Sequence, residues 1–572
     1  MSEMKLIDKK RIPIGFEDLK EIIDKNLYYV DKTGIIAEML DNPAKVTLFT
    51  RPRRFGKTLN LSMIRRFFEK EMHYDGNPVD NGYLFKDLKI SACGEKYLSH
   101  QGQYPVISLS LKSAKQPDYG MAYAMLKNRI SEEFRRHQYV LDGDVLSSAE
   151  KTQYQQILGL EENNVLYADS ILFLSACLEK YHDRKVIILI DEYDVPLENA
   201  YFAGFYEKMI TFIRSLFESA LKTNPHLEFA VITGCLRISR ESIFTGLNNL
   251  EIYSVMNPWY ADYFGFTEKE VKEMLSCYGL ESKFPELQQW YDGYRFGDAE
   301  IYNPWSILNY VKMAVKDQNI FPKPYWSNTS SNSIIRELVE HADMATRQEI
   351  ELLIAGGTIE KPVHEDITYG DIYESKDNLW NFLYFTGYLK KVGERMMEDS
   401  LHLEFAIPNR EIRSIYRDTI LSWFNKKLQK TDLSVLFSAI VNGDSTIMEE
   451  QIRMVLRGSI SYYDEQEKFY HGFMLGLFSG MQDYQLKSNR ESGDGRPDLI
   501  LIPYDERMPA VIMEFKYAGM PGEMEKLCSD ALQQILEKQY AQELVEEGYG
   551  HVLAYGICFC KKTCRVEGSG VL

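Results

Sequence analysis

The first half of the chain alternates short runs of apolar, largely β-branched residues with stretches of helical periodicity. Most positions within a run are apolar on consecutive residues, which is typical of strands buried on both faces of a sheet. Strands that alternate with helices form parallel sheets covered by helices on both sides, so this half is predicted to be an α/β domain. The runs are residues 46–50, 106–111, 186–190 and 229–233, and predicted helices include residues 59–69 and 170–181.

The remainder of the chain shows two further patterns. Residues 268–423 are mostly helical with a few short strands. Residues 379–412 are predicted as helix, strand, helix, which fits a small winged-helix module that either binds DNA or acts as a rigid lid. From residue 435 an α+β unit begins, with a helix at 465–478, a hairpin at 498–516, a helix at 523–547 and a strand at 552–560. A chain of 572 residues is long enough for several domains. We therefore predict three, at residues 1–265, 266–434 and 435–572.

Composition limits the function classes. The net charge of −18 argues against a non-specific nucleic-acid coat, and the charge is uneven along the sequence. Residues 51–70 hold seven basic side chains and one acidic, whereas residues 441–572 hold 13 basic and 21 acidic. Eight cysteines over this length indicate a reducing compartment, and no apolar run approaches the roughly 18 residues of a spanning helix. We expect a cytoplasmic protein that makes no use of a membrane.

The strongest motif of the first half is a strand that runs into a basic loop and then into a helix opened by Gly56-Lys57-Thr58. This arrangement aims backbone N–H groups and a helix N-terminus at a phosphate. Lys57 is expected to reach the β- and γ-phosphates, and the Thr58 hydroxyl to ligate Mg²⁺. Arg51 stands where the usual pattern has glycine, so standard loop geometry is not assumed. The residues expected to contact the nucleotide are Arg53, Arg54, Phe55, Gly56, Lys57, Thr58 and Leu59.

A second motif supports the first. The apolar run at 186–190 ends in Asp191-Glu192, where Asp191 is expected to hold Mg²⁺ through water and Glu192 to polarise the attacking water. The next predicted strand is followed by Arg237 and Arg240, which either contact the γ-phosphate or make ordinary ion pairs.

The C-terminal unit carries the clearest chemistry. Asp498 follows a proline at the start of one hairpin strand, and Glu514 and Lys516 share one face of the return strand. Two carboxylates on adjacent strands make a hard-oxygen site for Mg²⁺ or Mn²⁺, and Lys516 would position water or neutralise charge on a phosphate. The alternative is an exposed edge strand with an ion pair between Glu514 and Lys516. That alternative does not explain the Pro-Asp pair one hairpin away.

Supporting residues are less distinctive. Glu467 on the preceding helix and Glu491 before a glycine turn compete for the role of third acid, and Gln534, with Tyr540 further on, could contact the scissile region. Solvated helix faces are the alternative for all of them. His471 is expected to be structural. Cys558, Cys560 and Cys564 supply three ligands where a closed metal site needs four, so they are expected to pack as small apolar residues.

Several stretches together resemble the bacterial "AAA-ATPase-like" family, whose members usually carry a C-terminal PD-(D/E)xK nuclease-like domain. They are residues 12–16, 29–33, 51–57, 189–194, 290–294 and 302–306, and the resemblance as a whole covers nearly the whole chain. In that family an arginine at the position of Arg51 looks typical. The resemblance implies a P-loop ATPase domain with a parallel sheet and a restriction-endonuclease-like α+β domain. The aromatic loops at 290–295 and 302–305 are expected to be packing elements rather than ligand contacts.

The resemblance and the motifs together give one leading function and one alternative. The leading function is an ATP-binding and ATP-hydrolysing protein coupled to a Mg²⁺-dependent nuclease that acts on nucleic acid, DNA before RNA, in defence or mobile-element biology. Mn²⁺ is an alternative metal for the nuclease site, and a homo-oligomer is left open. The alternative is a regulatory ATPase whose nuclease-like domain only binds.

Overall fold

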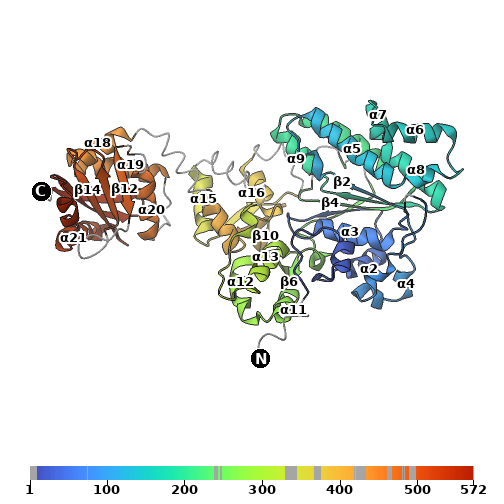
Figure 1. The fold of residues 1–572 in the computed structure, drawn as a ribbon, viewed down its shortest axis with the longest axis horizontal. Helices are drawn as coiled ribbons and strands as arrows, with labels where there is room; N and C mark the ends of the chain where they lie inside the picture. The colour runs from blue at the N-terminus through green and yellow to red at the C-terminus, as the bar shows by residue number, and fades with distance from the viewer. Residues whose placement is uncertain are drawn as a thin grey trace. The chain divides into compact units, whose positions relative to one another are not determined.

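The computed structural model describes residues 10–73, 75–237, 243–244, 248–328, 344–365, 375–417, 419, 433–459, 467–478, 481, 483–488 and 497–570. The chain divides into two compact units, Met1–Thr329 with Thr358–Ser414 and Ser330–Gly357 with Ile415–Leu572. Figure 1 shows the elements of both. The predicted domain boundaries at residues 265 and 434 stay predictions.

The first unit is built on a five-stranded parallel sheet with the strand order β2-β3-β4-β1-β5. Every residue of β1 and of β3 is buried, as continuous apolar runs predict. The α/β prediction for this half is confirmed, and β5 is a strand that the sequence pattern did not reveal. The strands are β1 (Val46–Thr50), β2 (Val106–Ser110), β3 (Val186–Asp191), β4 (Leu227–Gly234) and β5 (Leu250–Tyr253).

Helices cover both faces of this sheet, with α2 and α3 on one side and α5 and α8 on the other (Figure 1). The side chain of Asp118 caps the first turn of α5, and Ser147 and Glu150 form a reciprocal capping box on α6. The helices of this layer are α1 (Leu19–Asp24), α2 (Gly34–Asp41), α3 (Lys57–Phe68), α5 (Tyr119–Arg136), α6 (Ser148–Leu158), α7 (Asn164–Ala168), α8 (Ser170–His182), α9 (Val195–Phe202) and α10 (Tyr206–Phe217).

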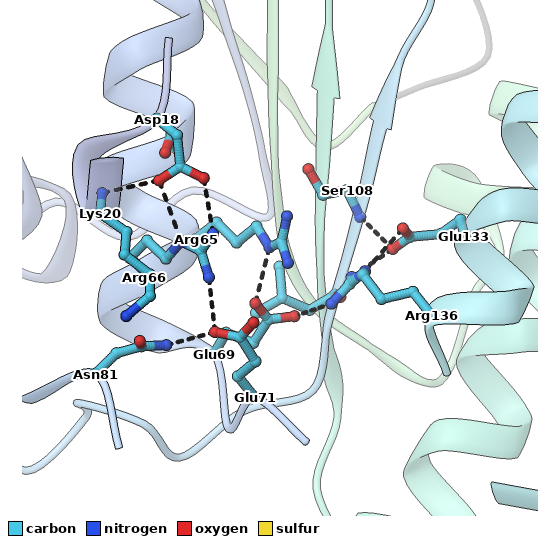
Figure 2. Close-up of polar contacts among 12 residues, drawn as sticks. Asp18, Lys20, Arg65, Arg66, Glu69, Glu71, Asn81, Ser108, Glu133 and Arg136 are labelled. Atoms are coloured by element: carbon cyan, nitrogen blue, oxygen red, sulfur yellow. Dashed lines mark hydrogen bonds and ion pairs between the residues drawn. The ribbon is translucent and has the colours of Figure 1, made fainter. Parts of the chain in front are cut away.

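Ion pairs link α3 to the residue before α1 and to α5, and hydrogen bonds to the backbone of Ser108 and Val106 connect α5 to β2 (Figure 2). On α3, Arg66 pairs with Asp18 at 2.7 Å. On α5, Arg136 pairs with Glu133 at 2.5 Å and also with Glu69, the residue that ends α3. Burial raises the pKa of Glu69, but Arg136 and its neighbours outweigh burial and hold that pKa below its ordinary value. The network therefore fixes the far end of the helix that begins at Lys57.

Two small antiparallel sheets complete the first unit. One has the order β6-β8-β7 beside α11, α12 and α13, and the other has the order β10-β11-β9 beside α16. The winged-helix reading of this region stays a prediction. The elements are β6 (Phe266–Thr267), α11 (Glu268–Tyr278), α12 (Phe284–Tyr291), β7 (Tyr294–Phe296), β8 (Ala299–Tyr302), α13 (Pro304–Ala314), β9 (Ile359–Pro362), α16 (Lys376–Phe385), β10 (Lys390–Met397) and β11 (Ser400–Ala406), and residues 410–417 are helical.

The second unit holds a mixed five-stranded sheet with the order β12-β13-β14-β15-β16, in which only the β14–β15 pair is parallel. Apolar residues of α18, α19 and α20 pack on one face, and those of α21 and α22 pack on the other. This arrangement confirms the predicted α+β unit. The elements are α18 (Ser434–Asn442), α19 (Ser445–Ser459), α20 (Glu467–Phe478), β12 (Tyr484–Ser488), β13 (Leu499–Pro503), β14 (Ala510–Tyr517), α21 (Met524–Glu537), α22 (Gln542–Glu546), β15 (Val552–Cys560) and β16 (Thr563–Gly570).

The single helix predicted at 523–547 is wrong in one respect, because the structure divides it into α21 and α22. Gln539 adopts a left-handed backbone with φ of 53°, which interrupts the helix. The interruption buries Tyr540 and Ala541 in the core between the two helices and the sheet. In neither unit does the described part include a helix with the length and apolar character needed to cross a membrane.

Candidate active sites

The loop at residues 51–58 joins the buried end of β1 to the start of α3. Gly56, the residue before the helix, has φ of 83°, a left-handed conformation that costs glycine little. Arg54 also has a positive φ, of 71°. The first N–H groups of α3 have no partner within the helix, so they form a donor set at the carboxyl edge of the sheet.

Lys57 is buried at this edge and folds back over its own loop. Its Nζ donates to the carbonyl oxygens of Arg51 at 2.8 Å and Pro52 at 2.9 Å, and lies 3.6 Å from Cys235 Sγ. A phosphate oxygen would compete with these carbonyls for the ammonium protons. The predicted phosphate-binding lysine is therefore held at the loop by groups that a ligand can replace.

The structure brings Thr58 and Asp191 together, with a third residue from β4. The Thr58 hydroxyl donates to Asp191 Oδ2 at 2.7 Å, and the Thr233 hydroxyl donates to Asp191 Oδ1 at 2.6 Å. Parallel strands place their carboxyl ends at one edge, which is why residues 133 and 42 positions apart in sequence from Asp191 meet there. Hydroxyl and carboxylate oxygens are the ligands that Mg²⁺ prefers, so these residues fit the ion that a nucleotide carries.

Glu192 follows Asp191 with a left-handed backbone, φ of 52°. Burial raises the pKa of its carboxyl group, the Lys57 ammonium lowers it and the Asp191 carboxylate raises it, with a raised pKa as the result. A carboxylate whose basicity is raised beside a phosphate loop is suited to accept a proton from water.

Sequence reasoning missed the part played by Asp194. This buried carboxylate accepts hydrogen bonds from the backbone N–H groups of Cys235 at 2.8 Å and Leu236 at 3.2 Å. The Tyr193 hydroxyl donates to the Leu236 carbonyl at 2.6 Å, and a Cβ on Gly234 would lie 2.4 Å from the Tyr193 ring. Together these contacts fix the chain that leaves β4 beside Lys57. The signal was present as the second aspartate, and third acid, of Asp-Glu-Tyr-Asp.

The structure places the other residues predicted to contact the nucleotide in different environments. Leu59 is half-buried in the first turn of α3, and Arg53 forms an ion pair with Glu198. The Phe55 side chain is fully buried, so only the backbone of this residue is left for a phosphate. Arg237 pairs with Glu365 at 3.2 Å, which is the ion-pair alternative stated for it. Arg240 lies outside the described residues.

In the second unit, the predicted carboxylates meet across the β13–β14 hairpin. Asp498 precedes β13, and its backbone N–H donates to Glu514 Oε2 at 3.4 Å. Asp498 Oδ2 in turn accepts from the Phe515 N–H at 2.8 Å. Lys516 Nζ lies 3.4 Å from Glu514 Oε1. The two acids and the lysine therefore occupy one end of the sheet, as the sequence predicts.

Glu514 is only 4% exposed and has a raised pKa of about 7. Burial is the main cause, the neighbouring Asp498 adds to the rise, and Lys516 opposes it. A divalent cation would relieve both causes because it supplies positive charge beside the two carboxylates. The donor set fits Mg²⁺ or Mn²⁺ by this criterion.

Gln534 reaches this site from α21. Its Oε1 accepts from Lys516 Nζ at 2.7 Å, and its Nε2 donates to Glu514 Oε1 and lies 3.5 Å from the Tyr540 hydroxyl. One amide therefore bridges the acid and the lysine.

Gly556 explains how α21 comes so near. It pairs with Glu514 in the β14–β15 ladder, and a Cβ there would lie 2.4 Å from the Cys528 carbonyl and 2.6 Å from the Leu532 nitrogen. Only glycine allows the helix backbone to lie this close to the strand. The residue was not singled out from the sequence, although a glycine inside an apolar strand is a known signal of close backbone approach.

His471 on α20 contacts the acidic end, with Nε2 at 2.8 Å from the Asp498 carbonyl oxygen. Glu467 begins the same helix one turn earlier, although its side chain lies outside the described residues, as does Glu491 entirely.

The three C-terminal cysteines are divided between two clusters. Cys558 and Cys560 pack with Cys528, whereas Cys564 lies in the larger core on the other face of the sheet. Burial raises the pKa of the Cys558 thiol to about 12. Across the described ranges, no group of three or more His, Cys, Asp or Glu side chains is arranged to hold a metal ion.

Comparison with known proteins agrees with this geometry. A family model described as a predicted AAA-ATPase matches residues 13–244, and one described as the PD-(D/E)XK nuclease superfamily matches residues 465–568. A protein of Azotobacter chroococcum mcd 1, described as an uncharacterized protein in the vnfD 5' region, is 26% identical over 341 residues. The match covers 58% of this chain and 57% of that relative. The chain therefore carries a predicted AAA-ATPase domain in its first half and a PD-(D/E)XK nuclease superfamily domain at its C-terminus.

Proposed function

We propose that the chain binds and hydrolyses ATP at the loop of residues 51–58 and cleaves phosphodiester bonds at the Asp498–Glu514 site, with the nucleotide controlling cleavage. The observation that carries the nuclease half is the bridged set of Glu514, Lys516 and Gln534 beside Asp498. In phosphodiester cleavage, two neighbouring carboxylates can bind a divalent cation, and a nearby ammonium can stabilise charge on the phosphate.

In the first site, the α3 N-terminus and Lys57 would bind the phosphates. Thr58 and Asp191 would hold Mg²⁺, which neutralises charge on the transferred phosphoryl group. Glu192 has the raised pKa and the position to take a proton from the attacking water. Arg237 would reach the γ-phosphate only after leaving Glu365, and this role rests on its place after β4.

In the second site, Asp498 and Glu514 would hold Mg²⁺ or Mn²⁺, which polarises the scissile phosphate. Lys516 would donate to a phosphate oxygen or orient the water, and Gln534 would keep its ammonium pointed at the site. Glu467 and Glu491 are the two candidates for a third acid. Nucleic acid, DNA before RNA, is the proposed substrate.

The test is metal-dependent cleavage of single- and double-stranded DNA and of RNA by the full chain, with and without ATP. We expect cleavage that requires Mg²⁺ or Mn²⁺, is lost in Asp498→Asn, and changes with ATP only when Lys57 is intact. Cleavage that survives Asp498→Asn would refute the site. ATP hydrolysis with no cleavage of any substrate would instead support the alternative, a regulatory ATPase whose C-terminal domain only binds.

The setting is part of the proposal and rests on resemblance alone. We propose a cytoplasmic enzyme that acts in defence against foreign DNA or in mobile-element biology. A homo-oligomer is compatible with it, and the molecular mass measured in solution decides that point.

A further inference from the structure

The side chains of residues 51–55 each contact another part of the first unit. Arg51 and Phe55 are fully buried, and Arg53 pairs with Glu198. Pro52 and Arg54 meet residues from segments far along the chain. A loop of this kind normally depends on glycines for its shape, and here one position carries arginine instead. Side-chain contacts of residues 51–55, rather than a glycine, therefore determine the conformation of the loop.

Phe296 on β7 contacts two of these side chains at once. Its ring lies 5.2 Å from the ring of Phe55, and the Arg51 guanidinium lies 5.2 Å from the Phe296 centroid. Arg51 also donates to the Tyr253 carbonyl at 2.7 Å. Tyr294, two residues before Phe296, meets Phe55 edge to face at 4.9 Å. The loop is thus anchored at both ends of its basic stretch to a strand more than 200 residues away.

Trp305 holds the middle of the loop. The Arg54 guanidinium lies 4.3 Å from the centroid of the Trp305 ring, and the indole N–H donates to the Tyr325 carbonyl at 3.2 Å. This hydrogen bond is made at the edge of the indole ring. It fixes the orientation of the ring face that the Arg54 guanidinium contacts. Arg54 has a positive φ, a conformation that non-glycine residues adopt at some cost, and the stacking offsets that cost.

Glycines permit two further close contacts. A Cβ on Gly387 would lie 3.0 Å from Pro52 Cβ, and Gly387 has φ of 89°. Gly265 donates its N–H to the Phe55 carbonyl at 3.0 Å, and a Cβ there would lie 2.9 Å from the Phe55 ring. Backbone on both sides of the loop therefore approaches it directly.

We propose that Phe296 and Trp305 are positioning residues of the nucleotide site. They hold the loop of residues 51–58 in the shape that presents its backbone N–H groups and Lys57 to phosphate, in place of the missing glycine. The inference rests on the proposed nucleotide binding and deepens it: the segment from β7 to α13 sets the affinity for the triphosphate. Neither residue is expected to contact the ligand.

The test has one readout that needs no nucleotide and one that does. Hydrogen exchange of the amides at 53–58 is measured in the nucleotide-free full chain for wild type, Trp305→Leu, Trp305→Phe and Phe296→Leu. MgATP is then titrated, and KM and kcat for hydrolysis are measured. Trp290→Leu is the matched control, because it removes a half-buried tryptophan from the neighbouring α12 without touching the loop.

We expect Trp305→Leu and Phe296→Leu to speed exchange at 53–58 and to raise KM about threefold to tenfold, with kcat little changed. Trp305→Phe keeps an aromatic face and is expected to recover most of the affinity. Trp290→Leu is expected to leave both readouts at wild-type values. The unfolding midpoint of each variant shows that the chain is folded.

Three outcomes would overturn the proposal. Unchanged exchange in both leucine variants means that the contacts do not hold the loop. Faster exchange with unchanged KM means that the loop shape does not set affinity. The same loss in Trp290→Leu means that any damage to this region has the effect. If MgATP does not protect residues 53–58 in wild type, the proposed nucleotide function fails, and exchange without nucleotide still decides the contact.

Discussion

At the end of β3, each carboxylate oxygen of Asp191 accepts a hydrogen bond from a threonine hydroxyl, whereas at β14 the Glu514 carboxylate lies beside a second carboxylate, Asp498. The first acid is satisfied by neutral groups of its own chain. The second is buried next to like charge, and its pKa is raised to about 7. Gln534 and Lys516 also contact Glu514, but burial and Asp498 outweigh Lys516, so the pKa of this acid is still raised.

This difference indicates which of the two sites binds a cation without a nucleotide. At Asp191, a metal would replace the hydrogen bond from Thr58 while Thr233 goes on orienting the carboxylate, so binding is favourable only when phosphate oxygens add to the ligands. At Glu514, a cation removes a repulsion that is already present. We therefore expect the C-terminal site to bind Mn²⁺ without a nucleotide and the N-terminal site to bind it only with one.

The largest expected effect separates the two chemistries. Lys516→Ala is expected to lower metal-dependent cleavage about 100-fold or more, because it removes the ammonium that would face the phosphate, and to leave MgATP binding unchanged. Lys57→Ala is expected to lower ATP hydrolysis by a similar factor and to leave basal cleavage in place. Rates of cleavage and of phosphate release are measured on both variants. Loss of both activities in either single variant would contradict the assignment of ATP hydrolysis to one site and cleavage to the other.

The next effect is a pH dependence confined to the second site. Glu514 binds metal as the carboxylate, so with a folded pKa of about 7 the apparent Mn²⁺ affinity should fall about tenfold for each pH unit below that value and level off above it. Titration calorimetry without nucleotide, from pH 5.5 to 8.5, measures this.

Stability without metal has the opposite trend. The folded state holds a proton on Glu514 up to about pH 7, whereas an ordinary glutamate loses it near 4.5, so the free energy of unfolding should fall as pH rises between these values. Glu514→Gln keeps the shape and should remove this part of the slope. An identical slope in Glu514→Gln, with EDTA present, would show that other groups cause it.

Much of this fold follows from the sequence, because buried strands carry a strong signal. The predicted strands at 46–50 and 552–560 match β1 and β15 residue for residue. β10 was not predicted, because its residues are half-buried or exposed and show no apolar alternation. A strand that contributes few side chains to a core does not require a periodic pattern of apolar residues.

The sites were predictable where the residues carry the chemistry and unpredictable where they only support it. Asp191 and Glu514 are polar groups at the end of, or inside, apolar strands, and Lys57 opens a helix directly after a glycine, so the sequence marks all three positions. Trp305 was expected to be a packing residue and Phe296 was not singled out. Their partner is a loop more than 200 residues away, and no local pattern encodes that distance. Gly556 carries no chemistry and acts through the space it leaves for α21.

A smaller effect is expected when the space that Gly556 leaves for α21 is filled. Gly556→Ala forces a methyl group against the α21 backbone, so we expect the C-terminal unit to lose about 1–3 kcal/mol of unfolding free energy. Cleavage should fall with it, because α21 carries Gln534 away from Lys516, while ATP hydrolysis should be unaffected. Urea unfolding and the two activity assays measure this. Gly570→Ala on β16 is the matched control, since no atom lies within 4 Å of the Cβ position there. Equal losses in the two variants would rule out the close approach as the cause.

The smallest expected effect concerns Asp191, whose two carboxylate oxygens both accept hydrogen bonds from threonines. Thr233 is 1% exposed, and Thr233→Val keeps its volume but removes the hydroxyl that donates to Asp191 Oδ1. A buried acceptor without its donor costs about 1–3 kcal/mol, partly recovered if water enters, so ATP hydrolysis should fall about threefold to tenfold. Thr233→Ser restores the donor and should restore the rate. Thr47→Val, a buried threonine on β1, is the matched control. If Thr233→Val leaves hydrolysis at the wild-type rate, the hydroxyls do not prepare Asp191 for the ion, and the contrast with Glu514 loses its basis.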